Sequence, residues 1–322
     1  MQRVLTTVTL LGLLVATAAA FAITEHFKLE KSAIYGVQVS AGAAASFHRN
    51  PPAVISPVCN CPTNVARIGL RLRHPDRVTV TIVDSAGHTV ATLANDRLLA
   101  AHVMQHFPWN GRTEVVGAPV PDGVYFASVH LANPSHTFQF ANKITVDTVP
   151  PEVRSASGLK PVLFAGRGRS VAIRYDFSEP ARPVVYLGDR RIIVGRHPRP
   201  SAKIKWGGRL DHRPLRAGTY VLSIGAVDPA GNETPAGKRK DVTVVLRYVD
   251  LSPKLTAVRA GHLFKVHVET AARRYTWRLG QRHGERRGRT LRLRAPTTPG
   301  TYRLVVTENG HATTAVVRVR AK

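Results

Sequence analysis

Arg216-Ala217-Gly218-Thr219-Tyr220 is the middle copy of a motif that occurs three times along this chain of 322 residues. The other copies are Pro121-Asp122-Gly123-Val124-Tyr125 and Thr298-Pro299-Gly300-Thr301-Tyr302. In each copy a glycine suited to a turn comes two residues before a tyrosine that opens an apolar strand pattern. The tyrosines are about 95 and about 82 residues apart, which is the length of a small β-sandwich. We therefore predict an all-β chain of three tandem sandwiches.

The first 50 residues do not follow this pattern. Residues 4–23 carry no charged side chain, and 20 residues in a helix are about 30 Å long, which is enough to span a bilayer core. Because Arg3 precedes this run, we predict that residues 1–23 form a single-pass signal anchor in the cell membrane with the repeats outside. The alternative is a signal peptide, cleaved at one of the small-x-small sites in residues 16–22, and a secreted protein. Residues 24–50 lack strong periodicity and are predicted to be a stalk.

The clearest strand pattern lies in residues 66–73, where Ile68, Leu70 and Leu72 alternate with arginine or glycine. Such alternation is typical of a strand with one buried face and one solvated face. Residues 78–83 predict the next strand, and Asp84-Ser85-Ala86-Gly87 after them is typical of a hairpin turn. The first domain is therefore predicted to cover residues 51–148.

Residues 52–148 resemble the FlgD-type immunoglobulin-like domain of bacterial proteins. The resemblance rests on four segments, which are Ser56-Pro57, Asp84-Ser85-Ala86-Gly87-His88-Thr89-Val90, Trp109-Asn110-Gly111-Arg112 and Val120-Pro121-Asp122-Gly123-Val124-Tyr125. The sequence departs from the family after Ser56-Pro57, where Val58-Cys59-Asn60-Cys61 replaces the usual Asn-Gly-Asp-Gly. The resemblance implies immunoglobulin-like (Ig-like) sandwiches and a role in surface or capping structures of bacteria.

The second and third domains are predicted to cover residues 149–249 and 250–322. Pro150 and Pro151 mark the boundary, because two prolines cannot continue a strand ladder. Residues 171–177 predict a strand, and residues 184–187 and 190–194 predict a hairpin around Gly188-Asp189. The last domain is predicted to be shorter and divergent.

Six aromatic residues are predicted to anchor the cores of the repeats: Trp109, Tyr125, Trp206, Tyr220, Trp277 and Tyr302. Burying one tryptophan removes about 150–250 Å² from water, worth roughly 4–6 kcal/mol as an upper bound. The alternative is an exposed aromatic platform that binds sugars. Burial of all three tryptophans would remove that alternative.

Cys59 and Cys61 are the only cysteines of the chain. Metal binding would need further ligands, and neither a second cysteine pair nor histidines at zinc-finger spacing accompany them. We expect a local disulfide, or two free thiols, that fixes a loop.

The chain is strongly basic, with 46 Lys and Arg against 20 Asp and Glu. Residues 250–322 hold 16 Lys and Arg against 4 Asp and Glu, a formal charge of about +12. Such a field attracts polyanions. A polyanion-binding patch is predicted at Arg273, Arg274, Arg278, Arg282, Arg286, Arg287 and Arg289. The alternative is that these arginines only occupy the solvated faces of strands and protect sheet edges.

No catalytic, cofactor-binding or metal-binding constellation is present in the sequence, so no enzyme activity and no cofactor are predicted. We predict a non-catalytic protein of the bacterial cell envelope whose repeats act as spacer and interaction module. Its expected partners are anionic cell-wall polymers or an envelope protein, while nucleic acid is not an expected partner of an exported chain. Two alternatives remain, a scaffold with a specific protein partner and an accessory carbohydrate-binding module.

Overall fold

The computed structural model describes residue 17 and residues 32–42, 53–114, 117–160, 162–166 and 169–321. The described residues from 32 onward are built from β-strands, with one short 3-10 helix, η1 (Ala236–Lys238), so the prediction of an all-β chain is confirmed. It divides into two compact units, residues 1–148 and 149–322. Each unit has its own hydrophobic core, and each is described by itself below.

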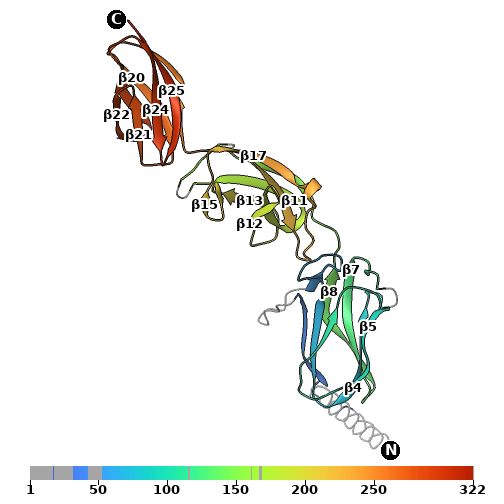
Figure 1. Cartoon of the computed structure of the whole chain (residues 1–322). Helices are drawn as coiled ribbons and strands as arrows, with labels where there is room; N and C mark the ends of the chain where they lie inside the picture. The colour runs from blue at the N-terminus through green and yellow to red at the C-terminus, as the bar shows by residue number, and fades with distance from the viewer. Residues whose placement is uncertain are drawn as a thin grey trace, which may run out of the picture. The chain divides into compact units, whose positions relative to one another are not determined.

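Unit 1 consists of two β-sheets that face each other (Figure 1). The first sheet has the strand order β1-β3-β6, and the second has the order β2-β8-β7-β4-β5. All neighbours are antiparallel except the β2/β8 pair, which is parallel. The strands are β1 (Ile34–Ala41), β2 (Ala53–Ile55), β3 (Ala66–Leu72), β4 (Asp76–Val83), β5 (Thr89–Leu99), β6 (Gln105–Trp109), β7 (Gly123–Leu131) and β8 (His136–Val146).

Alternating apolar residues explain why these segments form strands. Ile68, Leu70 and Leu72 of β3 are buried while Arg67 and Arg71 are exposed, as the sequence pattern predicts. The turn after β4 is also confirmed, since Gly87 has a φ of +88°, a backbone conformation that glycine adopts without a steric penalty.

The prediction of a stalk over residues 24–50 is wrong for Ile34–Ala41, which form β1 and pair with β3. The strand carries a bulge between Tyr35 and Gln38, and Gly36 inside it has a φ of +61°. This bulge shifts the buried residues Ile34 and Val39 out of simple alternation, so the period-two pattern is lost in the sequence.

The predicted anchor or signal peptide of residues 1–23 lies outside the described residues apart from Thr17. Within the described ranges, no helix has both the length and the apolar character that crossing a membrane requires.

Unit 2 contains two further pairs of sheets. In the pair formed by residues 153–247, β9 and β13 flank the first half of β11, and the second sheet has the order β10-β17-β16-β11-β12. Strand β11 runs through both sheets, because its register shifts between Asp176 and Ala181. The strands are β9 (Val153–Gly158), β10 (Val162–Phe164), β11 (Val171–Leu187), β12 (Arg190–Val194), β13 (Arg199–Trp206), β14 (Arg209–Leu210), β15 (Arg213–Pro214), β16 (Gly218–Val227) and β17 (Lys240–Arg247).

The pair formed by residues 249–320 has the sheet orders β18-β20-β23 and β19-β25-β24-β21-β22. We call it the C-terminal sandwich. Its core contains Trp277, Leu291, Val306 and Val317, all buried. The strands are β18 (Val249–Ser252), β19 (Leu255–Arg259), β20 (Leu263–Thr270), β21 (Arg274–Leu279), β22 (Arg282–Arg287), β23 (Thr290–Arg294), β24 (Gly300–Glu308) and β25 (His311–Arg320).

The same connectivity occurs in all three sheet pairs. In immunoglobulin lettering, strands A, B and E form one sheet, and A′, G, F, C and C′ form the other. The A′ strands β2, β10 and β19 each pair in parallel with the last strand of their sandwich, which is β8, β17 and β25. Two facing sheets with this strand order define an Ig-like β-sandwich.

The tyrosines of the repeated motif make one hydrogen bond in common. The hydroxyl of Tyr125 donates to the carbonyl of Pro121 at 2.7 Å. Tyr220 and Tyr302 likewise donate to the carbonyls four residues upstream, at 2.8 and 2.9 Å. This arrangement matches the tyrosine corner of Ig-like domains. It explains why glycine and tyrosine recur together, since the tyrosine holds the turn that leads into strand F.

We expect Tyr125→Phe to lower the free energy of unfolding of unit 1 by about 1 kcal/mol, the usual net contribution of one hydrogen bond. Burial raises the pKa of Tyr125, with the nearby Asp84 and Asp122 charges contributing, so its hydroxyl remains a donor at neutral pH. Tyr302→Phe should cost less, because its hydrogen bond is exposed. Urea unfolding of the full chain measures both losses, and a loss at Tyr302 larger than that at Tyr125 would contradict this ranking.

Candidate functional site

The candidate site lies at one end of the C-terminal sandwich, where two turns approach each other. Residues 271–273 connect β20 to β21, and residues 288–289 connect β22 to β23. Strand β22 is the edge strand of its sheet and pairs only with β21 among the described strands, with Arg274 opposite Arg287. This register places two arginines side by side at the end of the sheet that carries both turns.

A cleft of about 600 Å³ opens between these turns and a loop of the preceding sandwich. We call it the arginine cleft, because five arginines line it: Arg169, Arg273, Arg274, Arg287 and Arg289. The other described residues that line it are Thr270, Ala271, Ala272 and Gly288, and none of them carries a carboxylate.

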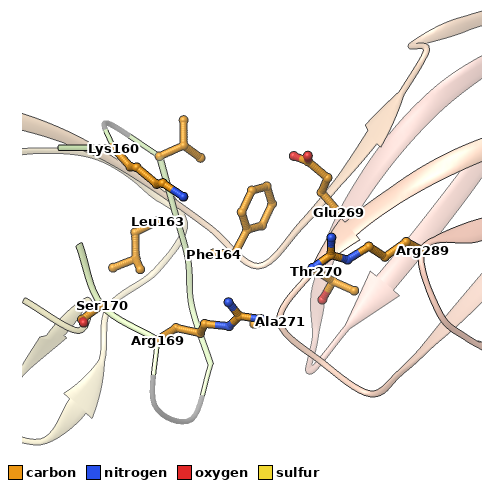
Figure 2. Close-up of a pocket in the computed structure, with 10 residues that line it drawn as sticks. Lys160, Leu163, Phe164, Arg169, Ser170, Glu269, Thr270, Ala271 and Arg289 are labelled. Carbon is orange, nitrogen blue, oxygen red and sulfur yellow. The ribbon is translucent and has the colours of Figure 1, made fainter. Parts of the chain in front are cut away.

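A second cavity of about 420 Å³ shares part of this lining, namely Arg169, Thr270, Ala271 and Arg289. Figure 2 shows Lys160, Arg169 and Arg289 reaching into the space around the Phe164 ring. The cationic lining is therefore continuous between the two cavities. Glu269 is the one acidic residue among the described residues that line them.

Few negative charges oppose the arginines. Arg274 donates to Glu285 at 3.1 Å, and both side chains are exposed. Glu308 is buried behind the cleft and accepts a hydrogen bond from the Thr270 hydroxyl. Burial raises the pKa of Glu308, although the Thr270 bond and the His311 charge act in the opposite direction. A raised pKa disfavours the ionised carboxyl, so Glu308 compensates the arginines less than an exposed glutamate would.

The two sandwiches of unit 2 are joined by one residue between strands, Tyr248, which is buried. Its hydroxyl donates to the Leu215 carbonyl at 2.6 Å, and its ring stacks on His311 with 3.6 Å between centroids. Asp250, just beyond it, forms ion pairs with Arg247 and Lys254. Burial alone would raise the pKa of Asp250, but the bonds from Lys254 and the Leu251 amide and the charges of Lys254 and Arg247 outweigh it and lower the pKa.

All seven arginines of the predicted polyanion-binding patch are exposed, but only some of them line the arginine cleft. Arg273, Arg274, Arg287 and Arg289 line the arginine cleft. The remaining three, Arg278, Arg282 and Arg286, lie elsewhere on β21 and β22, and Arg282 donates to the Arg294 carbonyl at 2.7 Å. Arg169 was missed, because it comes from a loop more than 100 residues away in the sequence, and no local pattern indicates that it joins the others.

The aromatic anchors fall into two groups. Trp109, Tyr125, Trp206 and Trp277 are buried, whereas Tyr220 and Tyr302 are half-buried against their cores. Trp109 and Trp206 lie at equivalent ends of β6 and β13 and donate to the carbonyl three residues downstream, at 3.1 and 3.2 Å. Trp277 lies instead on β21, a C strand. With all three tryptophans buried, none of them provides a platform for sugar rings.

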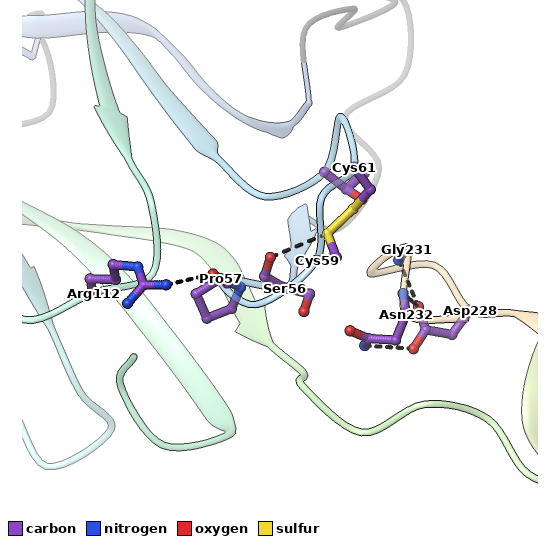
Figure 3. The surroundings of a disulfide bond; sticks show 9 residues. Ser56, Pro57, Cys59, Cys61, Arg112, Asp228, Gly231 and Asn232 are labelled. Atoms are coloured by element: carbon purple, nitrogen blue, oxygen red, sulfur yellow. Dashed lines mark hydrogen bonds between the residues drawn. A yellow bond between two sulfur atoms is a disulfide. The ribbon is translucent and has the colours of Figure 1, made fainter. Parts of the chain in front are cut away.

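Cys59 and Cys61 form a disulfide next to the segment that carries part of the FlgD-type resemblance (Figure 3). In that segment the Pro57 carbonyl accepts a hydrogen bond from Arg112 at 3.0 Å. The ring of Trp109 meets the ring of Tyr125 edge-on, with 5.3 Å between centroids. Three of the resembling segments are therefore neighbours in space.

Comparison with known proteins gives neither a family-model match nor a match among curated proteins. Solved structures with some similarity include a three-Ig fragment of titin in an E-to-A mutated variant (9% identity, 91% of this chain and 100% of that chain, TM-score 0.29). Fibronectin(III)-like modules of CbhA from Clostridium thermocellum give 10% identity, 65% and 94% coverage and a TM-score of 0.33. The Bacteroides ovatus protein SGBP-B, solved with a mixed-linkage heptasaccharide, gives 12% identity, 89% and 71% coverage and a TM-score of 0.26. The sheet topology, and not these similarities, defines the fold.

Proposed function

We propose that this chain is a non-catalytic protein of the bacterial cell envelope that binds anionic envelope polymers through its C-terminal sandwich. The arginine cleft carries the proposal, because it gathers five guanidinium groups and its described lining residues include no carboxylate. Guanidinium groups bind phosphate and carboxylate through paired hydrogen bonds. A formal charge of +26 on the chain adds long-range attraction toward polyanions.

In this proposal the chain has three Ig-like modules, the first of them FlgD-type, and residues 1–23 attach it to the membrane or direct its secretion. The neighbouring positions of Pro57, Arg112, Trp109 and Tyr125 support the FlgD-type assignment of residues 52–148. The first two modules act as a spacer. The one-residue junction at Tyr248, with its hydrogen bond and ring stack, supports a stiff connection between the second and third modules.

Binding to an anionic polymer should weaken steeply with salt, because it releases counterions. For five phosphate contacts we expect the affinity for poly(glycerol phosphate) to fall roughly 100-fold between about 50 and about 200 mM salt. Fluorescence anisotropy with labelled polymer and the full chain measures this, with uncharged dextran as the control polymer.

Two results would overturn the proposal. The first is an absence of binding to poly(glycerol phosphate) at low salt, which would leave the arginines as solvated strand faces. The second is salt-insensitive capture of one envelope protein that poly(glycerol phosphate) does not displace, which would instead support a scaffold with a specific protein partner.

A further inference from the structure

We infer that the arginine cleft is a discrete site for two or more closely spaced phosphate groups, and not one part of a diffuse basic surface. This inference rests on the proposed function and names the ligand chemistry of the same site.

The first argument concerns uncompensated charge. Of the five arginines that line the cleft, Arg274 is paired with a carboxylate, that of Glu285. The other four arginines form no ion pair with any described residue. Solvent and salt screen the repulsion between like charges less in a partly enclosed space than on an open surface, so the repulsion among these arginines is stronger in the cleft. A multiply charged anion between them would relieve this repulsion.

The second argument concerns enclosure. Gly166, in the loop that leads to Arg169, packs so closely on the β20–β21 turn that a Cβ atom there would lie 2.5 Å from the Cβ of Ala271. This close packing brings Arg169 to the same cleft as Arg273 and Arg289. Guanidinium groups from three separate segments therefore surround the cleft, whereas arginines on a flat sheet face would present charge from one side only.

The third argument concerns size and continuity. A volume of about 600 Å³ lies within the usual range of ligand sites, about 300–1,000 Å³, and exceeds what a single phosphate needs. The adjoining cavity continues the cationic lining through Arg169, Arg289 and Lys160 (Figure 2). A chain of linked phosphates can follow this lining, while an isolated anion would fill only part of it.

Arginine also bears on which anion fits. The planar guanidinium offers two parallel N–H groups that match the oxygens of a phosphate, and clusters of such groups are suited to high charge density. A carboxylate carries one charge, as an internal phosphate does, whereas a terminal phosphate carries up to two near neutral pH, so tripolyphosphate brings more charge into the cleft than a tricarboxylate does. The structure thus favours an oligophosphate over an oligocarboxylate.

The test compares two triple variants of the full chain that remove the same charge. The cleft variant is Arg273→Gln, Arg287→Gln and Arg289→Gln. The control variant is Arg303→Gln, Arg318→Gln and Arg320→Gln, whose arginines are exposed on β24 and β25, away from the cleft lining. Isothermal titration with tripolyphosphate should give one site per chain. We expect the cleft variant to lose at least tenfold in affinity and the control variant to stay within about twofold of the parent chain.

A second variant, which conserves the charge, distinguishes loss of paired hydrogen bonding from loss of charge or of folding. Arg273→Lys with Arg289→Lys keeps the charge but removes the paired donors, so an intermediate loss is expected and an unchanged affinity would overturn paired recognition. Tricarballylate, with three carboxylates, should bind at least tenfold more weakly than tripolyphosphate, and equal binding would overturn the phosphate assignment.

The outcomes separate this inference from the proposed function. Equal losses in the cleft and control variants, with binding to poly(glycerol phosphate) intact in the parent chain, would overturn the discrete site and leave the function standing. Failure of the parent chain to bind poly(glycerol phosphate), with tripolyphosphate still bound in the cleft, would overturn the function and leave the discrete site standing, and failure to bind either anion would overturn both.

Discussion

Trp206→Ala is expected to lower the free energy of unfolding of unit 2 by about 3–5 kcal/mol, the usual cost of truncating a large buried aromatic side chain. Trp206 is 2% exposed and meets Tyr220 edge-on with 5.8 Å between ring centroids. Its indole N–H donates to the Arg209 carbonyl at 3.2 Å, so the substitution creates a cavity and also frees that carbonyl. A loss of this size is a large fraction of the roughly 5–15 kcal/mol that stabilises a typical domain.

Hydrogen exchange followed by mass spectrometry on the full chain reports protection in both units at once. Trp206→Ala should lower protection in residues 153–247 and leave unit 1 unchanged, because each unit has its own core. Trp109→Ala is the matched control, since Trp109 occupies the equivalent place in unit 1 and should give the opposite pattern. Equal loss of protection in both units from either variant would contradict the separate cores.

The second large effect is expected at a glycine that sequence gives no reason to suspect. A Cβ atom on Gly195 would lie 2.5 Å from Cδ and 2.7 Å from Cγ of Pro183. The proline ring cannot rotate away, and the Gly195 amide donates to the Pro183 carbonyl at 2.8 Å, which fixes the distance between the two segments. We expect Gly195→Ala to cost about 1–3 kcal/mol, as overpacking in a rigid site does.

Gly237→Ala serves as the control, because no neighbouring atom lies within 4 Å of its added Cβ and it lies in η1. It should be neutral, or stabilising by up to about 1 kcal/mol through the unfolded chain. Urea denaturation of the two variants beside the parent chain measures the difference. A Gly195→Ala variant as stable as Gly237→Ala would show that β11 and β12 move apart easily.

Much of the fold follows from local patterns. Alternation predicts β3, and turn residues predict the hairpin of β11 and β12, where Gly188 has a φ of +60°. Where the structure departs from simple alternation, prediction fails, as in the bulge of β1 at Gly36. The sequence predicts two strands, at residues 171–177 and 184–187, and the structure joins them into the single strand β11. The local patterns miss the connection because the register shifts between Asp176 and Ala181, where β11 passes from one sheet to the other.

The candidate site was predictable only in part. Charge density along β21 and β22 indicates a basic end of the C-terminal sandwich. Composition cannot show that Arg273 and Arg289 line one cleft while Arg278 and Arg286 do not, since this depends on strand register and on which turns lie at the same end. Arg169 belongs to another sandwich, so its contribution depends on how residues far apart in the sequence pack.

The parallel pairs β2/β8, β10/β17 and β19/β25 have a mechanical consequence. In each pair, one strand lies near the start of its sandwich and the other ends it. A pulling force along the chain would therefore drag the two strands in opposite directions along their length, which loads their evenly spaced hydrogen bonds together. Bonds loaded in shear must break at once, whereas those of a hairpin pulled open break one after another. A chain held at one end and pulled at the other would thus resist tension at three successive points.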